Sequence, residues 1–423
     1  MESNPTPKWF IAIPVICLVA FSAAVFAASS NWRRGFLFMI SGLFGFLLKY
    51  GPFGFTCTFR TMLNAGDFTQ MRHMCLMLFF STLFISLLQI KHWIKHPFFF
   101  PSKDTFSLAH EKIGWSLVLG SYMFGMGMQL GSGCATGTLV GIGEGSLKSC
   151  LVFVFFIMGA TIGALNPVFN WWSKLPAFKS PTTIHWLWVL LILLVLTILT
   201  IVADRIVQII KERKNASGND QKSFESNLKQ TRLLMTIGVS DENDQKTVSK
   251  KFLHDLLIDA LIGLCIAAFF VCDGQVIGVM GVFPLIGGTI LKACGCKVST
   301  WDYYKTHPLP TNFLDTDMFV SDAFIALGAF LASSILRNFG HGQKKEWMEY
   351  VKGVVGGLLM GLGGRMSYGC NIGSMLSGIT SASMHGFVWM VCAICGSGTV
   401  FLVTYLINKL KETTQKGQVY DEI

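Results

Sequence analysis

Two cysteines in matching glycine frames are the residues of this chain whose type and spacing best suit a chemical role. Cys134 follows Gly133 and Cys370 follows Gly369, and the two cysteines are 236 residues apart (370 − 134). A lone cysteine in an apolar helix is usually a small packing residue. Here, however, the positions −9, −7, −1 and +3 from the cysteine are glycine in both frames: Gly125, Gly127, Gly133 and Gly137, then Gly361, Gly363, Gly369 and Gly373. The repeated frame predicts two halves of a duplicated membrane protein that share one site.

The chemistry that these frames would support is the binding of a soft anion. Each Gly-Cys pair separates two apolar segments, so each cysteine is expected at the start of a short broken or re-entrant helix. A helix start presents unpaired backbone N–H groups and the positive end of the helix dipole to an anion. A neutral thiol adds a weak S–H donor and a polarizable surface, which suits a sulfur-bearing anion. Thr136 and Asn371 would add uncharged hydrogen-bond donors.

A third cysteine, Cys57, lies in another segment where Gly and Pro interrupt the apolar pattern. Non-helical backbone at membrane depth is tolerated where it is buried in protein or lines a cavity, so the three cysteines are expected along one central pathway. Arg60 and Arg365 lie close in sequence to Cys57 and Cys370. A charged residue inside a membrane indicates a functional site by default, and the alternative is that each arginine snorkels at a helix end.

The elements that must hold these residues are membrane helices. The mean hydropathy is +0.53, only 14% of the residues are charged, and the chain has 43 glycines. These values predict an all-α, multi-pass plasma-membrane protein, which in a bacterium means the inner membrane. Spans are expected near 10–28, 35–50, 72–90, 113–133, 148–165, 184–204, 253–271, 276–293, 319–336, 351–369 and 386–408.

The chain divides at one polar stretch. Residues 1–203 are predicted to form the first membrane repeat and 252–410 the second, with a C-terminal tail at 411–423. The stretch 204–251 between them is rich in Lys and Arg at both ends, which predicts a cytoplasmic linker. Glu144 and Asp273 are expected to be turn residues at the membrane interface or partners for Lys and Arg.

Several functions are disfavoured by composition. The 12 cysteines are scattered, without zinc-ligand spacing, so neither a disulfide framework nor a metal site is expected. The net charge of +10 is explained by basic residues at helix ends rather than by nucleic-acid binding. The chain has no GxxxxGK[ST] motif, so it does not itself use ATP to drive transport. A transporter without a cofactor, and not an enzyme, is the expected class.

The chain resembles the YeeE/YedE family of membrane proteins at five places. These are Phe55-Thr-Cys57-Thr-Phe-Arg60, Gly131-Ser-Gly-Cys134-Ala-Thr-Gly137, Gly364-Arg365-Met-Ser-Tyr-Gly-Cys370-Asn-Ile-Gly373, Trp301-Asp-Tyr-Tyr-Lys305 and Ser383-Met-His385-Gly-Phe-Val-Trp389. The last two also resemble the selenium-metabolism YedE branch. The resemblance implies a pseudo-symmetric bundle of inverted repeats with re-entrant helices at its centre. It also implies uptake of thiosulfate-like compounds along a line of three cysteines, here Cys57, Cys134 and Cys370.

Three functions fit these observations. Uptake of a small sulfur-containing anion, thiosulfate first, is the leading hypothesis, and transport of a selenium compound is an alternative. A membrane sulfur-relay protein is another: a cysteine would take sulfur as a persulfide and pass it to a small cytoplasmic sulfur-carrier protein. The relay requires a low-pKa thiol beside a base or cation. Soft-metal transport ranks last, because repeated Met-x-x-Met or Cys-x-x-Cys patterns are lacking.

Overall fold

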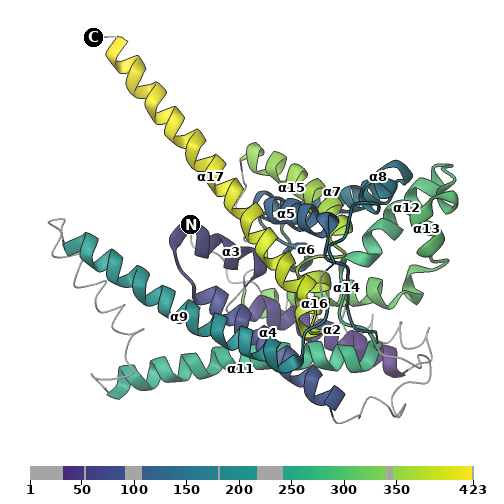
Figure 1. The fold of residues 1–423 in the computed structure, drawn as a ribbon, viewed down its shortest axis with the longest axis horizontal. Helices are drawn as coiled ribbons and strands as arrows, with labels where there is room; N and C mark the ends of the chain where they lie inside the picture. Colours follow the sequence, from purple (N-terminus) through teal and green to yellow (C-terminus); the bar gives the residue numbers. More distant parts are fainter. Residues whose placement is uncertain are drawn as a thin grey trace.

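The computed structural model describes residues 32–51, 54–90, 107–179, 182–216, 242–337, 339–340 and 346–421. The regular elements in these ranges are all helices, as predicted (Figure 1). The span expected near 10–28 lies outside the described residues, as does the middle of the polar linker.

The first half of the chain contributes eight described helices. They are α2 (Trp32–Tyr50), α3 (Phe55–Ala65), α4 (Thr69–Ile90), α5 (Trp115–Gly131), α6 (Ala135–Gly143), α7 (Leu147–Ala164), α8 (Asn166–Trp172) and α9 (Trp186–Ala216).

The second half begins with α11 (Glu242–Asp273) and contains both long helices and short turns. The others are η2 (Met280–Val282), α12 (Phe283–Ala293), η3 (Val298–Thr300), α13 (Asp302–Thr306), η4 (Phe313–Asp315), α14 (Asp317–Ile335), α15 (Trp347–Met366), η5 (Asn371–Leu376), α16 (Ser377–Thr380) and α17 (Met384–Asp421).

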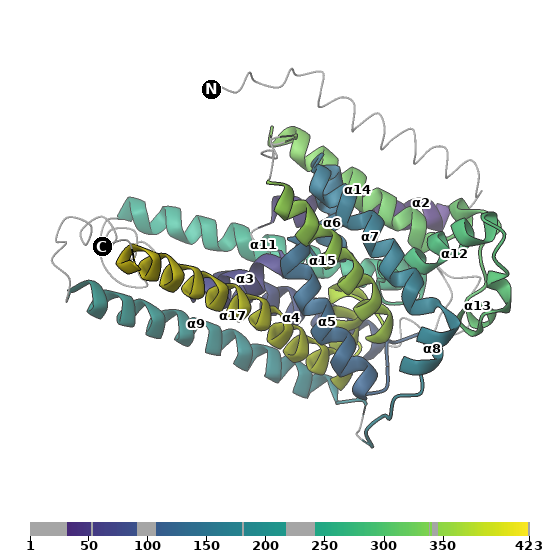
Figure 2. The ribbon, with the colours of Figure 1, turned by 90° about the horizontal axis from the view of Figure 1, so that it is seen from above.

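Seven segments of the described chain are long and apolar enough to cross a bilayer. They are α2 together with α3, and α4, α7, α9, α11, α14 and α17. The helix α9 leaves Leu191, Ile198 and Val202 exposed, a surface that lipid tails would cover. Helices α9, α11 and α17 extend beyond the others in both ribbon views (Figures 1 and 2). The chain is a multi-pass plasma-membrane protein.

The helix bounds differ from the expected spans at several places. The span expected at 276–293 is instead the short turn η2 followed by the 11-residue helix α12. Gly274, with φ 70°, ends the preceding helix in the left-handed conformation, and Pro284 starts the next one. Helices α9 and α11 also run further into the polar linker than their apolar parts, to Ala216 and from Glu242.

Ion pairs mark two ends of the bundle. At the end nearest the linker, Arg72 pairs with Asp204 at 3.5 Å, and Lys211 donates to the Ala65 carbonyl. At the opposite end, Arg33 pairs with Asp273 at 3.9 Å. Lys49 pairs with Glu144 at 2.8 Å. The expectation that Glu144 and Asp273 would be partners for basic residues is confirmed.

Glycines pack the two halves closely together. Helices α5 and α15 lie antiparallel: a Cβ on Gly120 would lie 2.6 Å from the Gly363 oxygen, and one on Gly356 would lie 2.7 Å from the Gly127 oxygen. Small residues let the two backbones approach in this way.

The glycines at position −9 of the two cysteine frames each pack against a helix of the other half. Gly125 lies against Ala393 of α17, whereas Gly361 lies against Ala160 of α7. Each of these partner helices follows the re-entrant segment of the other half. Such reciprocal packing is expected of two repeats that are related by a two-fold axis. The inverted repeat itself stays a prediction.

Candidate functional site

Cys134 begins the short helix α6 after a tight turn. Ser132 has φ 61°, in the left-handed region, and Gly133 follows it. Cys134 is then extended, with φ −86° and ψ −173°, and occupies the N-cap. Its carbonyl accepts from the Thr138 N–H at 2.8 Å, and its Sγ accepts from the Gly137 N–H at 3.3 Å. The thiol therefore lies directly over the unpaired N–H groups of a helix start.

The chain turns in the same way at Cys370. Tyr368 has φ 62°, and Cys370 is extended, with φ −95° and ψ −167°. The Cys370 carbonyl accepts from Ser374 N–H at 2.8 Å and more weakly from Met375 N–H at 3.4 Å. The second contact widens the first turn into a π-helix, a form often found at functional sites. The repeated glycine frame thus produces the same backbone turn twice.

The two thiols are buried near one another. Cys134 is 2% exposed and Cys370 is 0% exposed. Asn371, next to Cys370, donates to Met128 Sδ at 3.9 Å, so the second turn lies against α5, which leads to Cys134. Thr136 Oγ1, Asn371 Oδ1 and Ser374 Oγ lie at the same two helix starts. None of these three atoms has a hydrogen-bond partner among the described residues. An unsatisfied buried polar atom costs about 1–3 kcal/mol, so these atoms are candidates for contact with water or a ligand.

Cys57 is placed differently from the buried pair. It is exposed on the short helix α3, where its carbonyl accepts from Thr61 Oγ1 at 3.0 Å. The neighbouring residue Thr56 faces α5, because its carbonyl accepts from Gln129 Nε2 at 3.4 Å. The described hydrogen bonds place residues next to Cys57 and Cys370 against α5, the helix that leads to Cys134: Gln129 donates to the Thr56 carbonyl and Asn371 donates to Met128 Sδ at 3.9 Å. None of them joins two of the three cysteines directly.

Arg60 and Arg365 reach different ends of the α5–α15 pair. Arg60 donates to the Gln129 carbonyl and side-chain oxygens, each at 3.4 Å. Arg365 lies 4.8 Å from the centre of the Tyr303 ring, a cation–π contact. Its Nε has no hydrogen-bond partner among the described atoms. Gln129 and Arg365 occupy the same position, −5, in the two cysteine frames.

The motif Trp301–Lys305 forms the N-cap and most of the short helix α13 (Asp302–Thr306), whose Tyr303 contacts Arg365. His307 stacks on Tyr303 at 4.6 Å, and the Tyr304 hydroxyl donates to the Pro284 carbonyl. Partial burial, with a further contribution from the Arg365 charge, lowers the pKa of His307 below its ordinary value of 6.5. Hydrogen bonds from Lys305 and Asn170 lower the pKa of Asp302. This segment therefore packs against the C-terminal end of α15.

Two residues near this site were missed from the sequence. Gln129 could have been found by extending the alignment of the frames to position −5. Asp322 lies in α14 and is 5% exposed, and neither of its carboxyl oxygens has a hydrogen-bond partner among the described residues. The sequence does contain a signal for Asp322, because it is an acidic residue inside the apolar run 319–336. Charged residues in membrane helices are rare and usually functional.

Comparison with known proteins agrees with this architecture. The family model described as sulphur transport matches residues 50–399. The chain is 23% identical to the thiosulfate transporter TsuA of Spirochaeta thermophila over 291 residues, which cover 68% of this chain and 77% of the relative. It is 24% identical to the thiosulfate transporter TsuA of Escherichia coli over 301 residues, 68% of this chain and 74% of the relative.

A shorter match is to the probable transporter YedE of Salmonella typhimurium. The identity is 28% over 138 residues, which cover 32% of this chain and 34% of that protein. The match to the family model extends from the Cys57 segment to beyond Cys370. On this match, the chain belongs to the sulphur transport (YeeE/YedE) family of membrane proteins.

Proposed function

We propose that this protein takes up a small sulfur-containing anion, thiosulfate first, along a pathway that uses Cys57, Cys134 and Cys370. The observation that carries the proposal is the repeated turn, which puts two neighbouring buried thiols at two helix starts. The names of the two TsuA relatives support the choice of cargo.

The backbone and the thiols would bind different parts of the anion. The N–H groups at the starts of α6 and η5, with Thr136 and Asn371 beside them, suit the negatively charged oxygens. The S–H groups suit the terminal sulfur, because both partners are soft and polarizable. Each contact is weak, and weak binding at several sites lets an anion both enter and leave.

The arginines would draw the anion toward the two ends of the pathway. Arg365 is nine residues beyond Gly356 along α15, about 14 Å at 1.5 Å per residue, whereas Gln129 and Arg60 lie near Gly356. Two positive charges separated along the path would raise the local anion concentration at each end. The central thiols then meet the anion without a full charge beside them.

The exposure of the thiols suggests that the centre is closed in this conformation. Cys57 is exposed, whereas Cys134 and Cys370 are occluded. In this proposal, Cys57 meets the anion first or last, and a local movement at the two cysteine turns opens the centre.

The sulfur-relay alternative has less support. Among the described hydrogen bonds and ion pairs, no Lys, Arg or His contacts the thiol of Cys134 or Cys370. A persulfide-forming cysteine needs such a neighbour to favour the thiolate.

The test is anion uptake into liposomes that contain only the purified full chain. We expect labelled thiosulfate to accumulate inside the liposomes. A tenfold excess of unlabelled thiosulfate should block this uptake, whereas the same excess of sulfate should leave most of the uptake intact. Block by selenite would reassign the cargo to a selenium compound. Absence of uptake of all three anions would refute the transport proposal, and a persulfide found on any of the three cysteines by mass spectrometry would favour the relay.

A further inference from the structure

Asp322 is a buried carboxyl group with an unusual lack of partners. It lies in the membrane helix α14, five residues after Asp317, which pairs with Arg34 at 2.6 Å. Neither Asp322 oxygen has a hydrogen bond among the described residues. Another buried carboxyl group, Asp259, instead contacts His73 at 2.8 Å.

The helical position of Asp322 directs it toward the Cys370 turn. Met318, one turn earlier on the same face, packs on η2: a Cβ on Gly281 would lie 2.7 Å from its Sδ. The segment before η2 also contacts η5, because a Cβ on Gly373 would lie 3.8 Å from Gly278 Cα. The charge interaction between Asp322 and Cys370 agrees with this placement.

No charge in the surrounding elements compensates Asp322. On α2, Arg33 pairs with Asp273, Arg34 with Asp317, and Lys49 with Glu144, which follows α6. The turn η2 holds no charged residue, and η4 adds only the carboxyl group of Asp315. On η5 the titratable neighbour is the Cys370 thiol. A carboxylate in such surroundings is costly, so the resting group keeps its proton.

We infer that Asp322 carries a proton together with the anion, which makes this protein a proton-coupled anion transporter. This inference rests on the proposed function. From the entry side, a proton binds a carboxylate oxygen, and the resulting O–H group donates a hydrogen bond to an anion held at Cys370. On the exit side, the O–H bond breaks and the proton leaves to water. The remaining carboxylate repels the anion and promotes its release, and a new proton from the entry side resets the site.

The coupling is tested with the full chain in liposomes that contain a pH-sensitive dye. For the unaltered protein, we expect inward thiosulfate flux to acidify the interior. Asp322→Asn should reduce that acidification at least tenfold. It should lower thiosulfate exchange across equal pH by a smaller factor, because the asparagine amide still donates to the anion but cannot become the carboxylate that promotes release. Asp322→Glu should retain acidification. The control is Asp317→Asn, on the same helix but at its half-buried start, where it pairs with Arg34; it should change neither measurement more than about twofold.

A second measurement does not depend on the variants. A hydrophobic carbodiimide reacts with protonated carboxyl groups, and peptide mass spectrometry should find it on Asp322, with slower labelling when thiosulfate is present. Thiosulfate exchange by the unaltered protein without any proton movement would overturn the inference while leaving the proposed function intact. Acidification that persists in Asp322→Asn would overturn it equally. Absence of thiosulfate exchange in the unaltered protein would instead refute the proposed function.

Discussion

At the residue scale, the two cysteine frames share a backbone but differ at one charged position. Position −5 is Gln129 in the first frame, and it is joined by Arg60 from α3; in the second frame it is Arg365 itself. A positive charge is therefore present near both sites, although it comes from different helices. In the proposed pathway, the positive charge rather than one particular residue would therefore be the required property.

Replacing Arg365 by Gln tests this view. We expect the initial thiosulfate uptake rate at low substrate to fall about threefold to tenfold, because the charge no longer concentrates anions. The uptake of the unaltered protein should slow as salt rises from about 50 to 300 mM, and that of the variant much less. Arg365→Lys should keep most of the rate.

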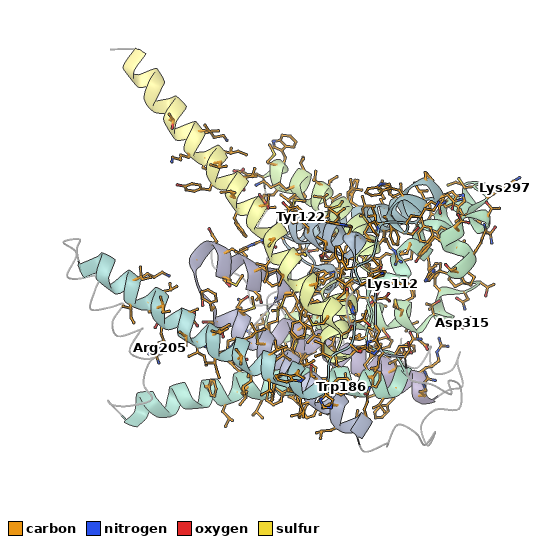
Figure 3. The ribbon with its side chains drawn as sticks, in the orientation of Figure 1. Lys112, Tyr122, Trp186, Arg205, Lys297 and Asp315 are labelled. Carbon is orange, nitrogen blue, oxygen red and sulfur yellow. The ribbon has the colours of Figure 1, made fainter. Side chains whose placement is uncertain are left out.

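The control for that variant is Lys297→Gln. Lys297 is exposed at the edge of the molecule, near the turn after α12, away from the central helices (Figure 3). The Lys297→Gln substitution removes the same positive charge as Arg365→Gln and should leave thiosulfate uptake unchanged. Equal uptake by Arg365→Gln and the unaltered protein would rule out a role for Arg365 in attracting the anion.

His307 gives the protein a pH-dependent contact at this end. Its folded pKa lies below the unfolded value of about 6.5, so folding favours the neutral ring. The stability that His307 contributes is complete above the unfolded value and is lost as pH falls from there through the lower folded pKa. The melting temperature in detergent should therefore drop between pH 7.5 and 5.5, and His307→Gln should make the drop smaller. A drop of the same size in both proteins would assign it to other groups.

At the element scale, the α5–α15 contact determines where both cysteine turns lie. These helices meet through glycine, and the turns follow directly from their ends. Any side chain at the contact pushes the backbones apart and moves both sites together.

Gly356→Ala measures the strength of this constraint. The added Cβ would lie 2.7 Å from the Gly127 oxygen, so the helices must shift. We expect a loss of about 1–3 kcal/mol in stability, read as a lower melting temperature in detergent.

Gly398→Ala on α17 is the matched control, since a Cβ there would meet no atom within 4 Å. That change should be neutral or slightly stabilising, because alanine favours helix. If the two variants have the same melting temperature, close glycine packing does not hold α5 against α15.

Much of this element organisation was predictable. Long apolar runs specify membrane helices, and the aligned glycines predicted a helix start at Cys134 and at Cys370. The exposure of Cys57 was not predictable, because it depends on which face α3 turns toward Gln129. The stacking of Tyr303 on Arg365 and the unpaired state of Asp322 also depend on residues distant in sequence.

At the scale of the whole molecule, two closely packed halves bury the thiols of Cys134 and Cys370, and the proposed pathway requires the centre to open. Thiosulfate carries two negative charges, and moving them into a cell with a negative interior costs about 2.3 kcal/mol per charge for each 100 mV. In the proposed pathway, the helix starts and arginines would lower the barrier inside the protein, but accumulation needs a further source of energy. The proton carried by Asp322 would offset one of the two charges and would add the energy of the pH gradient.

The central claim is that the two buried thiols contact the anion. Its most direct test is labelled thiosulfate uptake by Cys134→Ala and Cys370→Ala in liposomes, at equal amounts of folded protein. Cys395→Ala, at an exposed position on α17, is the control. We predict uptake below about one tenth of normal for each buried-site variant and normal uptake for the control, since a tenfold loss corresponds to about 1.4 kcal/mol. Normal uptake by both Cys134→Ala and Cys370→Ala would contradict the claim.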